Sequence, residues 1–409
     1  MKKIVSVLIV VLLIAALCGI LVSCGPKHAV TLDYNGGELK GKTGRDISVY
    51  EGKDVNLSKY KPVKEGYDLL QWKDNDGNVY GVDDKVRIDG EVTLTAVWTS
   101  RVVYTLDSSG ESYTVTGTTD NAAYLADTLT VAAEYSGKPV TAVASEAFKG
   151  CRSVKSISIP DSVKEIGGGA FNGCVSLTSL TLPYAGRNAQ ETDGENYGIP
   201  YLFGGQGGTY SGEKNNKMPH SLTTVIISDV ATFIPNWAFG NCNYIESVVL
   251  GKNITSIGDR AFNSCTALTD ITLPAKCNEV KQYAFYGDVN ANIVVEGAIS
   301  RLGQYAFANT KLKSINLLSM ESISQFAFSG TELREITIPS SVKSIGNAAF
   351  QKCKYLAKVT ILGDSVTLDK VAFAQCVALT NDGIDVSKVV IGADATGNSS
   401  PFLGSGVSI

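Results

Sequence analysis

The sequence has little histidine and no strong charge of either sign. Its 409 residues include only two histidines, His28 and His220. These leave almost no material for histidine-based metal sites or for a Ser-His-Asp triad. The net charge of −4 and the pI near 5.4 argue against the basic face that nucleic-acid-binding proteins usually carry. We therefore expect no catalytic residues, no metal, no cofactor and no nucleic acid partner.

The composition indicates a folded chain. Hydrophobic residues make up 44% of the sequence and charged residues 19%. This apolar fraction is too high, and the net charge too low, for a disordered protein. The length allows two or three domains with a sizeable buried core.

One long apolar run stands at the amino terminus. Lys2 and Lys3 precede an uncharged stretch over residues 4–20, and Leu21-Val22-Ser23-Cys24 follows it. The pattern predicts a secretory signal over residues 1–23, with an uncleaved membrane anchor as the alternative. Residues 21–24 resemble the lipobox of bacterial lipoproteins. This resemblance implies cleavage before Cys24, lipid attachment to its thiol, and a membrane-anchored place on the extracytoplasmic cell surface.

After a short linker at residues 24–28, residues 29–99 read as short strands with turns between them. Asn35-Gly36-Gly37 and Asp74-Asn75-Asp76-Gly77-Asn78 are turn signals. The order of Asn-Gly-Gly, then Glu65-Gly66-Tyr67, Trp72 and Trp98 resembles the B-repeat of internalin-type surface proteins. The resemblance implies a small β-grasp-like module that serves as a spacer or a binding unit.

The remainder of the chain is repetitive. The dipeptide Ala-Phe recurs with gaps of 23, 68, 23, 23, 22, 21, 22 and 23 residues between its phenylalanines. These phenylalanines are Phe148, Phe171, Phe239, Phe262, Phe285, Phe307, Phe328, Phe350 and Phe373. Such a period predicts a solenoid of stacked units. The gap of 68 is close to three units, and Phe203 within it takes the place of an Ala-Phe turn.

The repeated sequence motif is clearest in residues 338–361, and parts of it recur in residues 160–167 and 177–183. These residues resemble the BspA-like leucine-rich repeats of bacterial surface proteins. We expect a mainly β chain with a curved solenoid of short strands and no long helices. Repeats over residues 141–380 would carry an insertion at 184–220, between an N-terminal cap at 100–140 and a C-terminal cap at 381–409.

One unit explains the spacing. Leu180 and Leu182 share one face of a short strand, which Pro183 ends because it cannot donate to the ladder. Phe171 turns inward on the connecting path. A single unit cannot bury either face, so we expect the units to stack and the phenylalanines to form a buried spine.

Six of the nine cysteines follow a spine phenylalanine by three residues, namely Cys151, Cys174, Cys242, Cys265, Cys353 and Cys376. The other units have Asp288, Thr310 and Thr331 at this position. The spacing fits no zinc motif, and the sequence contains no Cys-x-x-Cys. We expect reduced structural thiols. A disulfide between adjacent units, such as Cys151–Cys174, is the alternative.

Two short motifs resemble ligand sites. Residues 36–43 match the phosphate-loop pattern, but no helix-forming segment follows, so we expect no nucleotide. Residues 74–78 resemble the start of a calcium loop, but the glycine comes early and position twelve is Lys85 rather than glutamate. We expect a hairpin turn there.

The first functional interpretation is an adhesin-like surface protein that binds extracellular or host proteins and is not an enzyme. Alignment of the units places one residue of each strand on the exposed face: Ser158, Thr181, Val249, Thr272, Val294, Asn316, Thr337 and Thr360. Of these, Thr181, Thr272, Asn316, Thr337 and Thr360 are candidate contacts. Threonine and valine also simply suit strands, which is the alternative explanation of this row. The aromatic residues Tyr184, Tyr201, Phe203 and Tyr210 of the insertion are further candidates, since aromatics dominate interface hot spots.

The second interpretation is a structural spacer or scaffold of the cell envelope. An accessory part in a polysaccharide-processing system is a weaker form of it. A catalytic role would need a further domain, and only about thirty residues follow the last repeat.

Overall fold

The computed structural model describes residues 25–64, 67–119, 127–192, 194–205, 217–287 and 290–408. The chain divides into two compact units, Met1–Arg101 and Val102–Ile409. The predicted signal peptide and Cys24 lie outside the described residues. No described helix has the length and apolar character needed to cross a membrane.

The first unit is a mixed β-sheet in the order β2-β1-β7-β4-β5, in which β1 and β7 are parallel. The elements are β1 (Lys27–Asp33), β2 (Gly44–Tyr50), β3 (Lys53–Asn56), η1 (Leu57–Lys59), β4 (Tyr67–Lys73), β5 (Val79–Tyr80), β6 (Lys85–Ile88) and β7 (Val92–Ser100). β3 pairs with β6 outside this sheet. Trp72 and Tyr34 are buried in the core with their ring centroids 6.1 Å apart. Assignment of this unit to the B-repeat modules remains a prediction.

The two segments of the first unit that resemble a phosphate loop and a calcium loop both form turns. The phosphate-loop-like segment runs into strand β2 instead of a helix. The Asp74 carboxylate accepts the backbone N–H groups of Asp76 and Asn78 at 3.0 and 2.8 Å, and Gly77 has a φ of 92°. This closes the expected hairpin between β4 and β5.

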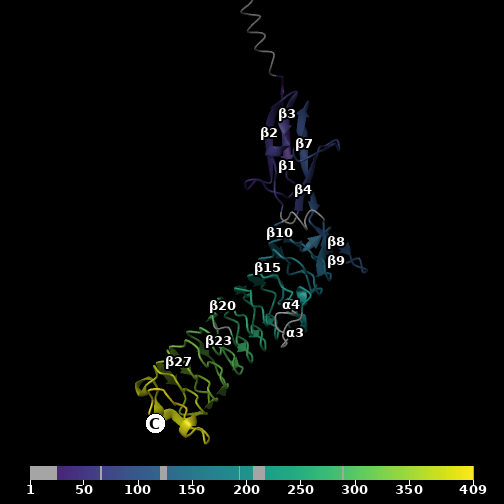
Figure 1. Cartoon of the computed structure of the whole chain (residues 1–409). Helices are drawn as coiled ribbons and strands as arrows, with labels where there is room; N and C mark the ends of the chain where they lie inside the picture. The colour runs from purple at the N-terminus through teal and green to yellow at the C-terminus, as the bar shows by residue number, and fades with distance from the viewer. Residues whose placement is uncertain are drawn as a thin grey trace, which may run out of the picture. The chain divides into compact units, whose positions relative to one another are not determined.

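The second unit begins with a sheet in the order β11-β12-β9-β8. Its strands are β8 (Val102–Leu106), β9 (Tyr113–Thr118), β11 (Glu134–Tyr135) and β12 (Lys138–Val143), and β14 (Glu165–Ile166) pairs in parallel with β12. Figure 1 shows the repeat array as stacked turns that continue from this end to the C-terminus.

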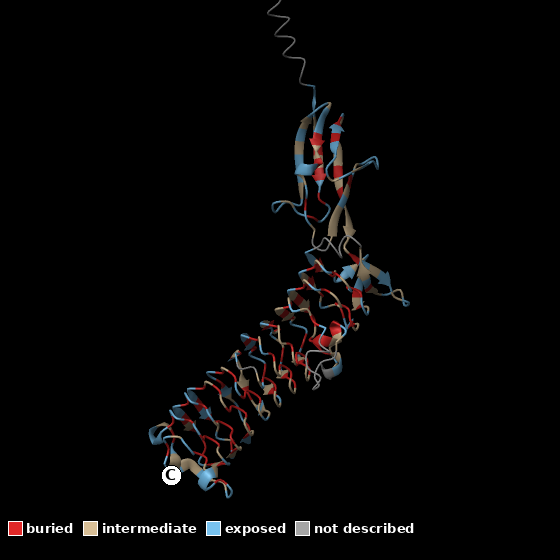
Figure 2. Cartoon of the chain, viewed as in Figure 1, coloured by how far each residue is buried: buried red, intermediate tan, exposed pale blue. Residues whose placement is uncertain are grey.

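The longest sheet of the array has seven parallel strands. These are β10 (Thr128–Thr130), β13 (Ser156–Ser158), β15 (Ser179–Leu182), β16 (Thr224–Ile227), β18 (Ser247–Val249), β20 (Asp270–Leu273) and β22 (Asn292–Val295). Their burial alternates, because Leu180 and Leu182 point to the core while Thr181 points outward. Figure 2 shows the buried residues running through the whole stack.

A second series of strands follows the first along the array, after a turn that contains proline in some units, as at Pro274 and Pro339. β17 (Phe233–Ile234), β19 (Ser256–Ile257), β21 (Glu279–Val280) and β24 (Arg301–Leu302) form one sheet. β26 (Ser322–Ile323), β28 (Ser344–Ile345), β30 (Val366–Leu368) and β31 (Val389–Ile391) form another. Every strand of this second series has two or three residues, which agrees with the expected short return path.

The seven-stranded sheet stops at β22. The next unit pairs β23 (Ala298–Ile299) with β25 (Asn316–Leu317), and β27 (Glu335–Ile338) then pairs with β29 (Lys358–Ile361). The stack continues beneath this break, because Ile293, Ile315 and Ile336 stay buried.

No long helix occurs among the described residues. The insertion contains α3 (Gly194–Tyr197) and α4 (Ile199–Leu202), and three 3-10 turns, η3 (Asn381–Gly383), η4 (Val386–Lys388) and η5 (Gly397–Ser399), lie near the C-terminus. The mainly β solenoid is the fold expected from the sequence.

The phenylalanine spine is the centre of the core. Neighbouring ring centroids lie 4.9 to 5.9 Å apart in two runs, from Phe148 to Phe203 and from Phe239 to Phe402. Phe203 is fully buried and packs against Phe171 with the two rings tilted by 49°, so it does take the place of an Ala-Phe turn. Phe402, which the sequence placed in the cap, extends the spine by one ring.

The seven cysteines of the described chain are free and buried. Cys174, Cys265, Cys353 and Cys376 each donate their thiol to the carbonyl of the spine phenylalanine one unit before, at 3.0 to 3.2 Å. Thr310 and Thr331 donate instead to the phenylalanine of their own unit, at 2.8 Å. The expectation of reduced structural thiols is confirmed, and the disulfide alternative is wrong.

Candidate functional site

The exposed face of the seven-stranded sheet carries the predicted row of strand residues. Register pairs Ser158 with Thr181 and Thr272 with Val294, and in the later sheet Thr337 with Thr360. Thr272 and Thr337 are exposed, whereas Thr181 and Thr360 are half-buried. The row has no charged member, so a ligand on it would be recognised by shape and hydrogen bonding.

Two details of this row differ from the prediction. Ile226 stands between Thr181 and Val249, a position that the alignment of units left out because the insertion hides that unit. Asn316 is exposed, but it pairs with Ala298 in the β23–β25 pair and does not continue the ladder from Val294. Asn316 thus has the exposed position expected of it, on a strand pair separate from the seven-stranded sheet.

The aromatic residues of the insertion are less available than expected. Tyr184 and Tyr201 are half-buried and pack against the core of the array. Phe203 is fully buried in the spine, so its proposed role as a contact residue is wrong. Tyr210 lies outside the described residues.

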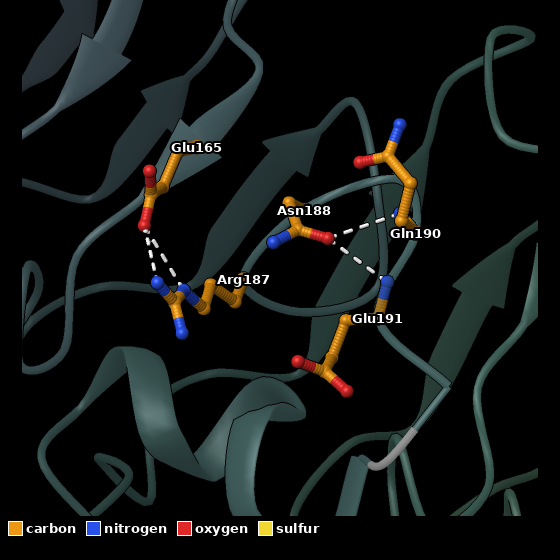
Figure 3. Close-up of polar contacts among 5 residues, drawn as sticks. All are labelled: Glu165, Arg187, Asn188, Gln190 and Glu191. Carbon is orange, nitrogen blue, oxygen red and sulfur yellow. Dashed lines mark hydrogen bonds and ion pairs between the residues drawn. The ribbon is translucent and has the colours of Figure 1, made fainter.

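The base of the insertion is held by polar contacts, as Figure 3 shows. Two nitrogens of Arg187 donate to one carboxylate oxygen of Glu165 at 3.0 and 2.8 Å, and this hydrogen bonding raises the pKa of Arg187. The Arg187 guanidinium also lies over the Tyr197 ring at 5.3 Å. Asn188 accepts the backbone N–H groups of Gln190 and Glu191 and so closes the turn. These contacts fix where the insertion leaves the array.

A second surface, which the sequence did not reveal, runs along a turn of the array. In each of the nine Ala-Phe units the residue two places before the spine phenylalanine has a left-handed backbone, with φ between 50° and 67°. Five consecutive units place large side chains there: Trp237, Arg260, Tyr283, Tyr305 and Phe326. We call these five residues the aromatic row.

The members of the aromatic row stack on one another. The rings of Tyr283 and Tyr305 lie 4.7 Å apart and those of Tyr305 and Phe326 4.5 Å apart, nearly parallel. The Arg260 guanidinium lies between Trp237 and Tyr283, at 5.4 and 4.6 Å from their ring centroids. All five side chains are half-exposed.

The backbone explains this regular spacing. The N–H of Tyr283 donates to the carbonyl of Gln304 at 2.8 Å, and that of Tyr305 to the carbonyl of Gln325 at 3.1 Å. The residue just before each member is polar, which gives an adjacent row of Asn236, Asp259, Gln282, Gln304 and Gln325, continued by Asn347. We call these six residues the amide row.

A left-handed backbone disfavours bulky residues, because Cβ approaches the following carbonyl oxygen at a cost of about 1–2 kcal/mol. Gly169 occupies the equivalent position in an earlier unit without that cost. Each stacked aromatic pair stabilises the folded protein by roughly 0.5–1.5 kcal/mol. Stacking therefore offsets much of the strain that these side chains introduce.

The described residues contain no cluster of three or more histidine, cysteine or acidic side chains that could hold a metal. Cys242 and Cys277 are fully buried, and burial raises the pKa of both thiols, that of Cys277 to about 12. Such thiols are poor nucleophiles.

Comparison with known proteins agrees with this architecture. The model of the BspA-type leucine-rich repeat region matches six copies over residues 135–192, 216–320 and 280–400, which is more than half of the chain. A search of curated proteins gives no match.

Several solved structures resemble the chain at low identity. A leucine-rich repeat protein from Bacteroides ovatus is 19% identical, with 74% of this chain and 92% of that chain covered and a TM-score of 0.36. A leucine-rich cell surface protein from Faecalibacterium prausnitzii is 19% identical, with 72% and 94% covered and a TM-score of 0.27. The pneumococcal vaccine antigen PcpA is 13% identical, with 76% and 86% covered and a TM-score of 0.30. On the strength of the repeat match and the stacked units, the chain belongs to the BspA-type leucine-rich repeat family.

Proposed function

We propose that this protein is a non-enzymatic, adhesin-like surface lipoprotein that binds extracellular or host proteins through its repeat array. The observation that carries this proposal is the outward row of strand residues, which is uncharged from Ser158 to Thr360 and has Asp270, Glu335 and Lys358 beside it on the same side of the strands. Stacked repeats present extended surfaces that suit large ligands. The cell surface protein from Faecalibacterium prausnitzii, which resembles this chain, supports a place outside the cell.

In this proposal Cys24 carries the lipid and the first unit separates the array from the membrane. Two or three acyl chains would anchor the protein stably, whereas one would not. Removal of residues 1–23 would take away Lys2 and Lys3 and change the net charge from −4 to −6. The mature chain would then have no electrostatic attraction to anionic lipids.

The test of the array is a binding assay with residues 25–409. Immobilised matrix proteins and host cells are incubated with the wild-type protein and with the triple variant Thr272→Lys, Thr337→Lys, Thr360→Lys. Because three lysines disturb an uncharged row of contact residues, we expect at least a tenfold loss of binding. Ser322→Lys is the matched control, since Ser322 is exposed on the short strand β26 outside this face.

Unchanged binding by the triple variant would contradict a role for this face. Absence of any protein partner, together with self-association in sedimentation, would favour the structural spacer.

A further inference from the structure

We propose that the aromatic row and the amide row together form a binding site for neutral carbohydrate chains, because stacked rings, unbonded carboxamides and an unpartnered carboxylate oxygen lie along one turn of the array. This site is separate from the sheet face on which the proposed protein binding rests. It would give the protein a second class of ligand.

The amide row supplies hydrogen-bonding groups that the protein does not use. In the described part of the chain, the side chains of Gln282, Gln304 and Gln325 make no hydrogen bond, although their backbone carbonyls do. A carboxamide offers both donors and an acceptor. A sugar hydroxyl likewise donates and accepts, so a line of carboxamides matches a line of hydroxyls.

Asp259 and Arg260 provide the strongest polar groups of the site. Arg260 donates to Oδ2 of Asp259 at 3.0 Å, while Oδ1 is buried without a hydrogen-bond partner among the described residues. The guanidinium is held between Trp237 and Tyr283, which fixes the direction of its remaining donors. The exposed part of this ion pair, whose Arg260 and Asp259 side chains are 31% and 33% exposed, can donate to one hydroxyl and accept from its neighbour.

Aromatic groups supply the apolar side of the site. The rings of Tyr283, Tyr305 and Phe326 cover one another's faces, and all three side chains are half-exposed. Tyr286, which is 37% exposed, stands beside them at 5.4 Å from Tyr283 and nearly perpendicular to it. Sugars have apolar C–H faces as well as hydroxyls, and they would use both parts of this surface.

The charge pattern selects a neutral ligand. Asp259 and Arg260 compensate each other, and the two rows carry no charge from Gln282 to Asn347. An anionic polysaccharide would find no series of cations to pair with. A ligand that repeats along one direction fits rows that repeat every 4.5 to 4.7 Å along the array.

The experiment uses residues 25–409 with starch, laminarin and mannan as neutral polysaccharides, and heparin and polygalacturonate as acidic ones. Affinity electrophoresis identifies a binding polysaccharide, and calorimetry then gives its Kd. We expect at least one neutral polysaccharide to bind. In Gln304→Ala, Gln325→Ala the Kd should rise at least tenfold while the thermal midpoint changes little, because these side chains make no hydrogen bond in the described part of the free protein.

Two further variants separate binding from structure. Tyr283→Phe keeps the ring in the stack and removes only the hydroxyl, and we expect it to weaken binding without loss of stability. Gln351→Ala, which changes a glutamine outside both rows, is the matched control and should bind as the wild type. Retention by none of the neutral polysaccharides, retention by heparin alone, or an unchanged Kd in the double glutamine variant would overturn the proposal.

The result is distinguishable from that of the protein-binding test. The triple lysine variant of the sheet face should keep carbohydrate binding, and the double glutamine variant should keep protein binding. Loss of one activity therefore leaves the other measurable.

Discussion

Lys352 holds a left-handed backbone, with φ of 63°, two places after its spine phenylalanine. The equivalent residues Gly150, Gly173 and Gly330 have φ between 71° and 78°. The left-handed backbone at this position favours glycine, yet several units have another residue there. The free-energy cost of a side chain at this position can therefore be measured by exchanging glycine and other residues in equivalent units.

Gly150→Ala should lower the free energy of unfolding by about 1 kcal/mol. A Cβ at Gly150 would meet no atom within 4 Å, so the loss reports backbone strain alone. The reverse change, Lys352→Gly, should stabilise the protein by roughly 0.5–1 kcal/mol. Urea unfolding of both variants measures this. If Gly150→Ala unfolds at the same urea concentration as the wild type, the backbone of the array relaxes at this turn and the expected strain is absent.

Buried thiols make stability depend on alkaline pH. Burial raises the pKa of Cys277 to about 12, whereas an unfolded thiol titrates near about 8.5. A pKa raised in the folded state gives stability that is complete below the unfolded pKa and is lost as the pH rises through the folded value. We expect the urea midpoint to fall between about pH 8.5 and pH 12.

Cys277→Ala isolates this contribution, since tyrosines and lysines also titrate in that range. The variant should lose less stability than the wild type between pH 7 and pH 10. Thiol counting adds a second check. Residues 25–409 should give seven reactive thiols when unfolded without reductant, and almost none when folded.

Prediction of single residues from the sequence succeeded where the same residue type recurs at the same position of each unit with the same structural role. The Ala-Phe dipeptide identified the spine, and the cysteine position identified the thiol ladder. The aromatic row was missed because tyrosine and tryptophan carry no mark of a left-handed backbone, which these residues rarely adopt. Counting two places before each spine phenylalanine would have shown aromatic or arginine side chains in five successive units.

The elements of the array are strands of two to four residues, and none can be stable alone. Each buries its inner face against the units before and after it, so the loss of one interior ring is felt by two neighbours. Phe262 stacks on Phe239 at 4.9 Å and on Phe285 at 5.1 Å. Phe402 stacks on Phe373 at the end of the spine.

Phe262→Ala should therefore cost roughly 3–5 kcal/mol of unfolding free energy, and Phe402→Ala clearly less. Phe402 ends its run and is 4% exposed, so its removal leaves a cavity that water and the chain end can fill. Denaturant unfolding monitored by circular dichroism measures both. Equal losses would mean that the last unit is as integral to the stack as an interior one.

At the level of elements, the regular spacing of the Ala-Phe dipeptides predicted the solenoid and its short return strands. Stacked units can bury all their inner residues only when equivalent residues lie above one another. The break between β22 and β25 could not be predicted. Burial continues through Ile293 and Ile315 across it, so the hydrophobic pattern is unchanged. The change lies in backbone pairing, and it coincides with the shorter gaps of 22, 21 and 22 residues between Phe285 and Phe350. The insertion hid Ile226 for a similar reason, since it removed the spacing used to align the units.

The whole molecule combines a predicted lipid anchor with an array that has two candidate binding surfaces. The sequence suggested one of these surfaces, the sheet face, because alternation along a strand shows which side is exposed. The other required the stacked geometry. Neither the ligand nor its orientation follows from periodicity, which describes packing alone.

The anchor can be tested on the full chain. Cells expressing the wild type and Cys24→Ala are labelled with a clickable fatty acid. We expect label on the wild type alone, because the acyl chains require the Cys24 thiol. Cys277→Ala is the control and should be labelled as the wild type. Equal labelling of Cys24→Ala would contradict the lipoprotein assignment.

The thiol ladder has a consequence for how the chain matures. Sγ of Cys174, Cys265, Cys353 and Cys376 is used as a hydrogen-bond donor to a main-chain carbonyl, so these turns close without any covalent crosslink. Folding of the array then needs neither an oxidant nor a disulfide isomerase. A freshly exported chain could assemble turn by turn from its own contacts, at a rate that does not depend on the redox state of its surroundings.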